Sequence, residues 1–398
     1  MDAGPAPGAR CAGRRPKLLF LVTEDWYFCS HRLPVARAAR DLGFDVVVAT
    51  RVDRHGARIR DEGFALRAIA WRRRGDQLTG AVRSVRAIAR LYREERPDLL
   101  HHVAVKPVLF GSLARVLAFR DGTAAPVAIN SLMGLGSGFA ATTLAARMRR
   151  PLLGLAVRLA AGAGGHIVVQ NPDDAARLGR LGIAPERIAL IRGSGVDTAH
   201  FAALPPPGTG PLTVALVARM LRDKGVLDAV AAIRRLRSRG LAIELELAGP
   251  TDPGNAGSLS AQTLSRLAAE PGIRWLGDVA DVRTVWRRAA IAVLPTSYGE
   301  GVPKALLEAA ACARPIIASD VPGCREVVRP GETGLLVPPR DIAALAEAIA
   351  ALAADPALRL NMGRAGRSLV ECHFAEEIVA RETAALYRAA LAERMARR

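Results

Sequence analysis

Two carboxylates, Glu300 and Glu308, bracket the start of a predicted helix within the segment PTSYGEGVPKALLE. The helix is expected to open at Pro303, because the first turn of a helix does not use the N–H group that proline lacks. The amides of Gly301 and Val302, with the positive end of the helix, can receive an anion such as a diphosphate. Taken singly, Glu300 is also compatible with a helix-terminal charge and Glu308 with a solvated face. Together they indicate a site for an anionic ligand.

Two cations, Arg219 and Lys224, follow a predicted strand in the segment VARMLRDKG. Side chains that leave a strand end and enter a helix start reach into the cleft of an open α/β sheet. A guanidinium and an ammonium placed there can hold a diphosphate leaving group without a metal ion. We therefore expect no metal and no other cofactor. The alternative interpretation is a solvated basic turn.

Short apolar strands alternate with helical patterns along both halves of the chain, which predicts two doubly wound parallel sheets, an α/β fold. A proline- and glycine-rich stretch between them predicts a linker. Ligands of such sheets bind at the carboxyl ends of the strands, so the two units are expected to face each other across a cleft. The predicted division is a flexible N-terminus at 1–16, a first domain at 17–203, a linker at 204–211, a second domain at 212–374 and a final helix at 375–398.

Length and composition agree with two globular domains, since a chain of 398 residues is long for one core. Half of the residues are hydrophobic and 4% are aromatic, which excludes fibrous and disordered classes. No uncharged apolar run is long enough to span a membrane, and no apolar signal core precedes the first strand. The five cysteines are scattered, which favours reduced thiols. We expect a cytosolic protein or one on a membrane surface.

The net charge of +18 is concentrated in the first half of the chain, where residues 1–200 carry +14. Basic residues beside amphipathic helices suit a leaflet of anionic lipid. A helix with Arg147, Arg149 and Arg150 beside apolar leucines is the clearest candidate. Nucleic acid is the rival partner, although no nucleic-acid motif accompanies the charge. The third interpretation is a chain that simply uses arginine on solvated faces.

The chain resembles retaining glycosyltransferases of family 4 over nearly its whole length. The residues that carry this resemblance are Arg219 to Gly225, GSGVD at 193–197 before Phe201, the Glu300 and Glu308 pair, and DVPGCRE at 320–326 with Gly331, Gly334 and Pro338. The first half is similar to bacterial sugar transferases of capsule, O-antigen and glycan-carrier assembly, including those that add N-acetylgalactosamine to a lipid-linked sugar. The residues that carry this second resemblance are VTEDWYFCSHRLP at 22–34, RPDLLH at 96–101, Lys106-Pro107, Gly134-Leu135-Gly136 and Gln170-Asn171.

The resemblance implies the GT-B fold, a UDP-sugar donor, turnover without a metal, and a final helix that crosses back onto the first domain. It gives the ribose hydroxyls to Glu308, the donor sugar to Glu300, and the diphosphate to Arg219 and Lys224. It also places the uracil against the backbone of Leu276 and Gly277.

The first domain departs from the family pattern at Met133, because many members have histidine before the glycine that is Gly134 here. Methionine cannot shuttle a proton, so His31 and His101 are the remaining weak candidates on the acceptor side, with His102 behind them. The cations Arg32 and Lys106 suit an acceptor diphosphate. The cluster Trp26–Phe28 is interpreted either as simple packing or as an apolar lip for a lipid tail.

The sequence predicts a retaining glycosyltransferase that moves a sugar, an N-acetylhexosamine by resemblance, from UDP to a polyprenyl-diphosphate-linked acceptor at the cytoplasmic membrane face. The expected partners are a UDP-sugar, the lipid-linked acceptor and an anionic membrane surface, and nucleic acid is not expected. A UDP-sugar 2-epimerase of the same fold is the alternative within the fold. A basic nucleic-acid-binding protein is the alternative from another class.

Overall fold

The computed structural model describes residues 14–70, 78–120, 125–134, 154, 157–162, 165–208 and 210–396. Within these residues the chain forms two parallel sheets, one for each domain, with the strand orders β3-β2-β1-β4-β5-β6-β7 and β10-β9-β8-β11-β12-β13. Both orders reverse direction beside the first strand of the sheet, as in doubly wound nucleotide-binding folds. The predicted fold class is confirmed.

The first sheet consists of β1 (Lys17–Glu24), β2 (Asp45–Arg51), β3 (Ala65–Ala68), β4 (Leu99–Val103), β5 (Val127–Ser131), β6 (His166–Val169) and β7 (Ile188–Leu190). Its helices are α1 (Asp25–His31), α2 (Leu33–Asp41), α3 (Gly56–Asp61), α4 (Leu78–Glu95), α5 (Val105–Ala118) and α8 (Pro172–Arg180). The middle of β1 is apolar and fully buried because helices cover both faces of a parallel sheet. The strand pairs in parallel with β2 and β4 on its two sides, and its pairing with β2 shifts register between Leu21 and Glu24.

The second sheet consists of β8 (Leu212–Val217), β9 (Ile243–Ala248), β10 (Ile273–Gly277), β11 (Ile291–Leu294), β12 (Ile316–Ser319) and β13 (Gly334–Val337). Its helices are α9 (Val226–Ser238), α10 (Ala261–Ala268), α11 (Arg283–Arg288), α12 (Lys304–Ala311), α13 (Cys324–Val327), α14 (Ile342–Ala354) and α15 (Pro356–His373). Strand β11 pairs with β8 across the reversal point. The loops that follow these two strands therefore start side by side.

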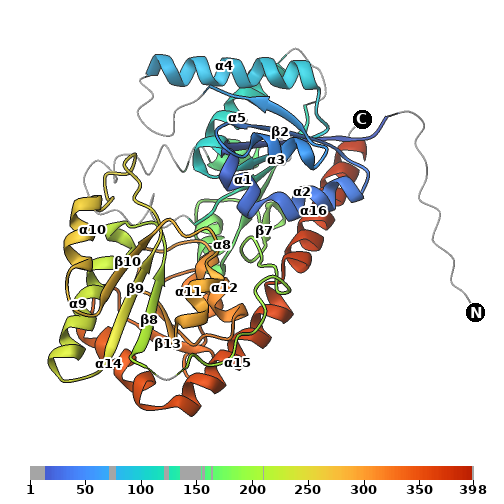
Figure 1. Ribbon diagram of the computed structural model, residues 1–398. Coiled ribbons are helices and arrows are strands. Elements are labelled where there is room, and N and C mark those ends of the chain that lie inside the picture. The colour runs from blue at the N-terminus through green and yellow to red at the C-terminus, as the bar shows by residue number, and fades with distance from the viewer. Residues whose placement is uncertain are drawn as a thin grey trace, which may run out of the picture.

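The last helix, α16 (Glu376–Ala396), leaves the second domain and packs against α2 of the first. Figure 1 shows it in red, running from α15 beside the lower domain to the upper one. Val379, Tyr387 and Ala390 are buried in the first-domain core, where Tyr387 contacts the ring of Phe20. The helix therefore belongs to the first domain in space although it follows the second domain in sequence.

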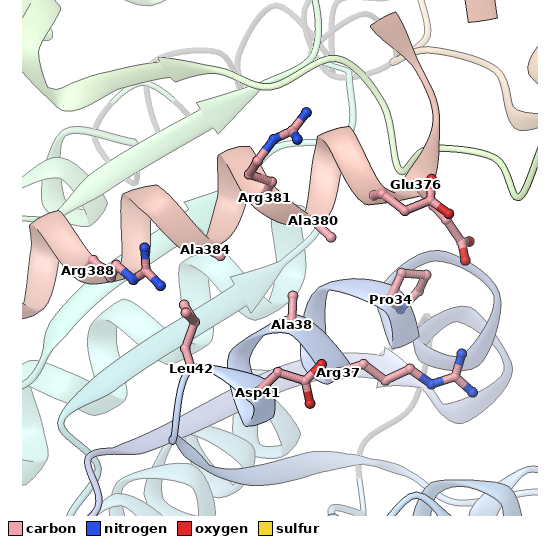
Figure 2. Close-up of a pocket in the computed structure, with 11 residues that line it drawn as sticks. Pro34, Arg37, Ala38, Asp41, Leu42, Glu376, Ala380, Arg381, Ala384 and Arg388 are labelled. Atoms are coloured by element: carbon pink, nitrogen blue, oxygen red, sulfur yellow. The ribbon is translucent and has the colours of Figure 1, made fainter. Parts of the chain in front are cut away.

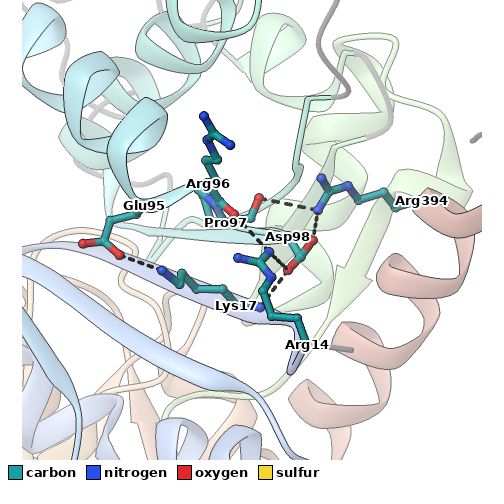
Figure 3. Close-up of polar contacts among 7 residues, drawn as sticks. All are labelled: Arg14, Lys17, Glu95, Arg96, Pro97, Asp98 and Arg394. Carbon is teal, nitrogen blue, oxygen red and sulfur yellow. Dashed lines mark hydrogen bonds and ion pairs between the residues drawn. The ribbon is translucent and has the colours of Figure 1, made fainter. Parts of the chain in front are cut away.

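Two polar contacts fix α16 to strand β4 and the residue before it. Asp98 accepts hydrogen bonds from Arg394 at 2.7 Å, from the Lys17 amide at 2.8 Å and from Arg14 at 3.0 Å (Figure 3). His101 Nδ1 lies 2.5 Å from the Tyr387 hydroxyl. Three strand residues and seven helix residues both rise by roughly 10 Å, so the two contacts can form together without bending either element.

The chain crosses between the two domains twice. The first crossing follows Val196, and the second, at Phe374–Glu376, lies next to Val196. The Val196 amide donates to the Phe374 carbonyl at 2.9 Å, and the Glu376 amide donates to the Val196 carbonyl at 3.0 Å. Gly195 has a φ of +75°, and a Cβ there would lie 2.5 Å from the Glu376 Cα. These hydrogen bonds join the two passages into one connection.

The predicted helix with Arg147, Arg149 and Arg150 lies outside the described residues, as do Arg72–Arg74 and residues 1–13. The Trp26–Phe28 cluster lies within helix α1 (Asp25–His31), and its members differ in burial. Phe28 is fully buried against Phe20, whereas Trp26 is 36% exposed. Among the residues whose structure is described, no helix combines the length and the apolar character that crossing a bilayer would need.

Candidate functional site

A cleft of about 650 Å³ lies between the two domains, at the carboxyl ends of both sheets. Its first-domain lining includes Trp26, Tyr27, Ser30, His31, Met133, Gly134 and Gln170. Its second-domain lining includes Arg219, Lys224, Asp278, Tyr298, Glu300, Gly301, Val302, Pro303, Lys304 and Glu308. The cleft thus brings together all three residues predicted to be catalytic, together with Glu308.

Lys224 and Glu300 form an ion pair at the point where the second sheet reverses its strand order. Lys224 closes a 3₁₀ turn after β8, and its ammonium group donates to Glu300 Oε2, on the loop after β11. Burial opposes the charged ammonium, but the Glu300 carboxylate outweighs it and raises the pKa of Lys224. The second carboxylate oxygen, Oε1, is buried and has no hydrogen-bond partner among the described residues. One acceptor atom of Glu300 is therefore left without a partner among the described residues.

Gly225 sets the direction in which Lys224 enters the site. Its φ is +74°, in the left-handed region, and a Cβ at this position would lie 2.0 Å from the Pro295 carbonyl oxygen. Only glycine fits so close to the end of the neighbouring strand. The turn that presents Lys224 therefore depends on this glycine.

Arg219 lies two residues after the end of β8 and lines the cleft, and its side chain is about one-third exposed. Its guanidinium group pairs with Asp252, a mostly buried carboxylate in the loop after β9. Since Asp252 occupies one edge of the guanidinium, Arg219 is held in place and can still present N–H groups to an anion. The two cations predicted to hold a diphosphate thus enter one cleft from neighbouring turns.

The loop amides behave differently from the prediction. The Val302 amide donates to Gln170 Oε1 at 2.9 Å, so a first-domain side chain occupies the group that was expected to receive an anion. Helix α12 begins at Lys304, with Pro303 one residue before it at the N-cap. Gly301 lies between Gln170 and Gly134, close enough that a Cβ on Gly301 would be 2.0 Å from Gln170 Oε1.

Glu308 lines the same cleft one turn into α12 and is partly buried. Burial raises the pKa of its carboxyl group to about 7, although the nearby Lys304 ammonium acts in the opposite direction. Lys304 also donates to the Ser30 carbonyl of the first domain. The sequence analysis did not identify Lys304 as a site residue. Its position could have indicated one, because a cation in the first turn of a helix is disfavoured by the helix dipole.

Leu276 and Gly277 are not among the residues that line the cleft, contrary to the prediction that they present backbone to a base. They end strand β10 at the edge of the sheet, and the Gly277 carbonyl accepts a hydrogen bond from the Gly249 amide at 2.7 Å. That carbonyl is used to hold two loops together. The next residue, Asp278, does line the cleft.

On the first-domain side, His31 and Gly134 line the cleft. The His31 ring stacks on Tyr27 with centroids 4.1 Å apart, and its Nδ1 lies 2.6 Å from the Ser30 hydroxyl. Burial, with the positive charges of Lys304 and Arg32, holds the pKa of His31 well below its usual value. His31 therefore faces the cleft as a neutral imidazole.

The other three acceptor-side candidates lie away from the cleft lining. His101 is fully buried in β4, where its ring nitrogens contact the Tyr387 hydroxyl and Ser131 Oγ. Arg32 is buried behind Met133, whose sulfur lies 2.7 Å from its guanidinium nitrogen. Lys106 lies over the Phe110 ring on α5. The polar partners of His101 are supplied by distant parts of the chain, and strand-end position alone could not reveal them.

A second cavity of about 410 Å³ lies between α2 and α16 (Figure 2). Its floor contains Ala38, Leu42, Ala380 and Ala384, and charges of both signs surround it. One of its cations, Arg37, is paired with Glu62 at 2.8 Å. This cavity lies where the two helices cross, and no described residue at a strand end lines it. We therefore take the interdomain cleft as the candidate site.

Comparison with known proteins agrees with this geometry. Residues 17–161 match the family model described as "Glycosyl transferase 4-like", and residues 211–355 match "Glycosyl transferases group 1". The chain is 35% identical to a glycogen synthase of Mycobacterium tuberculosis over 206 residues, 51% of this chain and 49% of that protein. It therefore spans only about half the length of this relative.

A relative that aligns over more of the chain comes from Campylobacter jejuni. It is N,N'-diacetylbacillosaminyl-diphospho-undecaprenol alpha-1,3-N-acetylgalactosaminyltransferase, 25% identical over 370 residues, 89% of this chain and 94% of that protein.

Solved structures share the fold. The HepE protein of Anabaena, solved in complex with UDP and glucose, superposes with a TM-score of 0.76 at 16% identity, covering 94% of this chain and all of that one. Sucrose-phosphate synthase from Thermosynechococcus elongatus has the same TM-score at 23% identity and covers 96% of this chain and all of its own. With each domain matched by a glycosyltransferase family model and the two-domain GT-B fold shared throughout, the chain belongs to the group 1 and 4-like glycosyltransferases.

Proposed function

We propose that this glycosyltransferase moves an N-acetylhexosamine from a UDP-sugar to a polyprenyl-diphosphate-linked acceptor, with retention of configuration at the anomeric carbon. The observation that carries the proposal is the meeting of Arg219, Lys224 and Glu300 in one cleft, opposite His31 and the aromatic residues of α1. Two cations beside a carboxylate suit a diphosphate attached to a sugar that becomes cationic as it leaves.

In this mechanism the bond between the anomeric carbon and the diphosphate oxygen breaks, and the acceptor hydroxyl oxygen forms the new bond to the same carbon. Arg219 and Lys224 stabilise the negative charge that develops on the leaving diphosphate. Glu300 complements the positive charge on the anomeric centre. The acceptor proton passes to the departing diphosphate, so no group of the protein has to change its protonation state. The two cations supply the charge that a metal ion would otherwise provide.

Glu308 is proposed to accept hydrogen bonds from the ribose hydroxyls of the donor. Its carboxylate form is the better acceptor, and its pKa of about 7 means that it titrates near neutral pH. Donor binding therefore favours the deprotonated state, and binding weakens as the pH falls below the pKa.

The expected pH dependence has a definite sign. Donor KM is expected to rise about tenfold as the pH falls from about 8 to about 6, because protonation removes the acceptor form of Glu308. The measurement is donor KM against pH for the native protein and for Glu308→Gln, whose amide does not titrate. Glu308→Gln is expected to have a high donor KM that stays flat over this range. An equal slope in both proteins would contradict the role given to Glu308.

The lipid-linked acceptor is proposed for the first-domain side of the cleft. Trp26 is exposed at the rim and Tyr27 lies beside it, which gives an apolar lip next to the neutral His31. The Campylobacter relative is named for a diphospho-undecaprenol-linked sugar, which supports an acceptor of the same class here.

An anionic membrane surface on the cytoplasmic side is the proposed place of reaction. Helix α4 exposes Arg83, Arg86 and Arg90, and the adjacent α5 exposes Leu113 and Val116, the latter by 63% of its surface. Cations beside exposed aliphatic side chains suit a leaflet of anionic lipid. These exposed residues of two packed helices support peripheral attachment of the first domain, where the acceptor would be presented.

The proposal is tested by UDP release from UDP-N-acetylhexosamines with two acceptors, a polyprenyl-diphosphate sugar in anionic or neutral vesicles and the same sugar without its diphosphate lipid. We expect a far higher kcat/KM on the lipid-linked sugar, a further gain on anionic vesicles, and unchanged activity in EDTA. Equal kcat/KM on both acceptors would overturn the acceptor assignment. Loss of activity in EDTA that manganese or magnesium restores would overturn the metal-independent chemistry.

Epimerisation of the donor at C2 is the competing activity for the same cleft. Incubating the protein with UDP-N-acetylglucosamine alone separates the two, because a transferase leaves the sugar unchanged and an epimerase converts it. A basic nucleic-acid-binding protein is the alternative from another class, and it gives Glu300 and Glu308 of the cleft no purpose. A shift assay at physiological salt tests it.

A further inference from the structure

The loop that carries Glu300 is held from the opposite domain by two side chains that the mechanism does not use. Gln170 and Asn171 directly follow strand β6 and are both buried. Gln170 Oε1 accepts the Val302 amide at 2.9 Å, and Asn171 Nδ2 contacts the Glu300 carbonyl at 3.4 Å. The first domain therefore contacts the backbone on each side of Gly301, next to the proposed catalytic carboxylate.

These contacts come from rigidly placed groups. Asn171 caps helix α8, because its Oδ1 accepts the Asp174 amide at 2.8 Å and its Nδ2 donates to the Asp174 carboxylate at 3.1 Å. Gln170 Nε2 faces the Met133 sulfur at 3.6 Å, which leaves Oε1 directed at the loop. Because both side chains are fixed within the first domain, they can transmit the position of that domain to the loop.

The loop around Gly301 packs so closely against the first domain that no side chain would fit between them. Gly134 has a φ of +94°, and a Cβ on it would lie 2.4 Å from the Gly301 amide nitrogen. On the other side of the loop, a Cβ on Gly323 would lie 2.1 Å from the Gly301 carbonyl oxygen. The peptide of Gly301 is thus enclosed between one glycine from each domain. The contact with Gly134 forms only when the two domains are together.

From these contacts we propose that Gln170 is a positioning residue that couples closure of the two domains to the placement of Glu300 beside Lys224. When the domains separate, the Val302 amide loses its acceptor and the loop loses its support on the first-domain side. The donor diphosphate is held by Arg219 and Lys224, which both belong to the second domain, so donor binding does not need this contact. Gln170 therefore acts on turnover and leaves donor affinity largely unchanged. The inference rests on the proposed UDP-sugar chemistry of the cleft.

The decisive variant is Gln170→Met, which keeps an unbranched side chain of similar volume but replaces the amide acceptor with a weakly accepting thioether. We expect kcat to fall about tenfold, the order expected when one hydrogen bond made in the reactive arrangement is lost. Donor KM, the Kd for UDP and the melting temperature are expected to stay close to the native values. Gln262→Met, on the exposed face of α10, is the matched control and should behave like the native protein.

A second measurement does not depend on activity. Small-angle X-ray scattering with UDP present should give a larger radius of gyration for Gln170→Met than for the native protein, because fewer contacts hold the domains together. An unchanged kcat with an unchanged radius would overturn the proposal. A fall in melting temperature, or a rise in donor KM in proportion to the loss of kcat, would also overturn it in favour of a structural or donor-binding role. If the native protein releases no UDP, the proposed function fails, and the scattering comparison still decides whether Gln170 holds the domains closed.

Discussion

Arg219→Ala is expected to lower kcat by about 100-fold or more, the range observed when one charge donor to a transition state is removed. The guanidinium group lies at the reversal point of the second sheet and is held there by Asp252. It needs no rearrangement to meet the charge that develops on the leaving diphosphate. Lys224→Ala is expected to lose as much, because Lys224 reaches the same region from the next turn.

The check is a comparison of kcat and melting temperature with those of Arg239→Ala. Arg239 forms an exposed ion pair with Glu347 at 2.6 Å in the same domain, so its loss removes one arginine without touching the cleft. The control should retain native turnover and a native melting temperature, since an exposed ion pair contributes little to stability. The melting temperatures of Arg219→Ala and Lys224→Ala separate a loss of chemistry from a loss of folding, because the partners Asp252 and Glu300 are mostly buried. Near-native turnover by Arg219→Ala or Lys224→Ala would show that the leaving group is held by other residues.

Glu300→Gln is expected to lower kcat by about 100-fold, because the amide keeps the size of the side chain but removes the negative charge that faces the anomeric centre. The substitution also takes away the counter-charge of Lys224, whose side chain is only 14% exposed. The ammonium group then loses the interaction that raises its pKa. The expected fall in kcat therefore has two contributions. One is the loss of the negative charge beside the anomeric centre, and the other is weaker binding of the diphosphate by Lys224.

The two contributions can be separated by measuring UDP affinity alongside kcat. Loss of the Lys224 counter-charge affects binding of UDP itself, whereas the loss at the sugar appears only in turnover of the donor. Glu347→Gln, at the exposed Arg239 pair, is the matched control and should leave both quantities unchanged. If Glu300→Gln kept native kcat, the carboxylate would have no part in the chemistry.

The donor side of the cleft was largely predictable from the sequence because its residues follow strand ends locally. Arg219 and Lys224 lie in the segment between β8 and α9, and Glu300 lies in the loop between β11 and α12. In a doubly wound sheet these two strands are neighbours, so alternation of strands and helices is enough to bring the residues together. The roles given to them are tested by the variants above.

The acceptor side was less predictable because its polar residues are used by parts of the chain far away in sequence. His101 was a candidate because it lies near the predicted end of a strand, but the hydroxyl of Tyr387, 286 residues later, contacts one of its ring nitrogens. Asp98 is likewise used by Arg394. Local pattern cannot reveal such partners, since they depend on where the final helix packs. Gln170 shows the reverse case: the sequence marked it only as part of a family resemblance, and its proposed role comes from a contact with the opposite domain.

The crossing of α16 has a consequence for the order in which the protein is made. Val379, Tyr387 and Ala390 complete a hydrophobic core that also contains Phe20 and Phe28 from the opposite end of the chain. During synthesis the ribosome releases these last residues only after the entire second domain has emerged. The amino-terminal domain must wait, with part of its apolar interior uncovered, for the final stretch of polypeptide. The second domain can therefore finish folding before the first domain, although the first domain is synthesised earlier. A chaperone that binds exposed apolar surface of nascent chains would need to stay longest on the first domain.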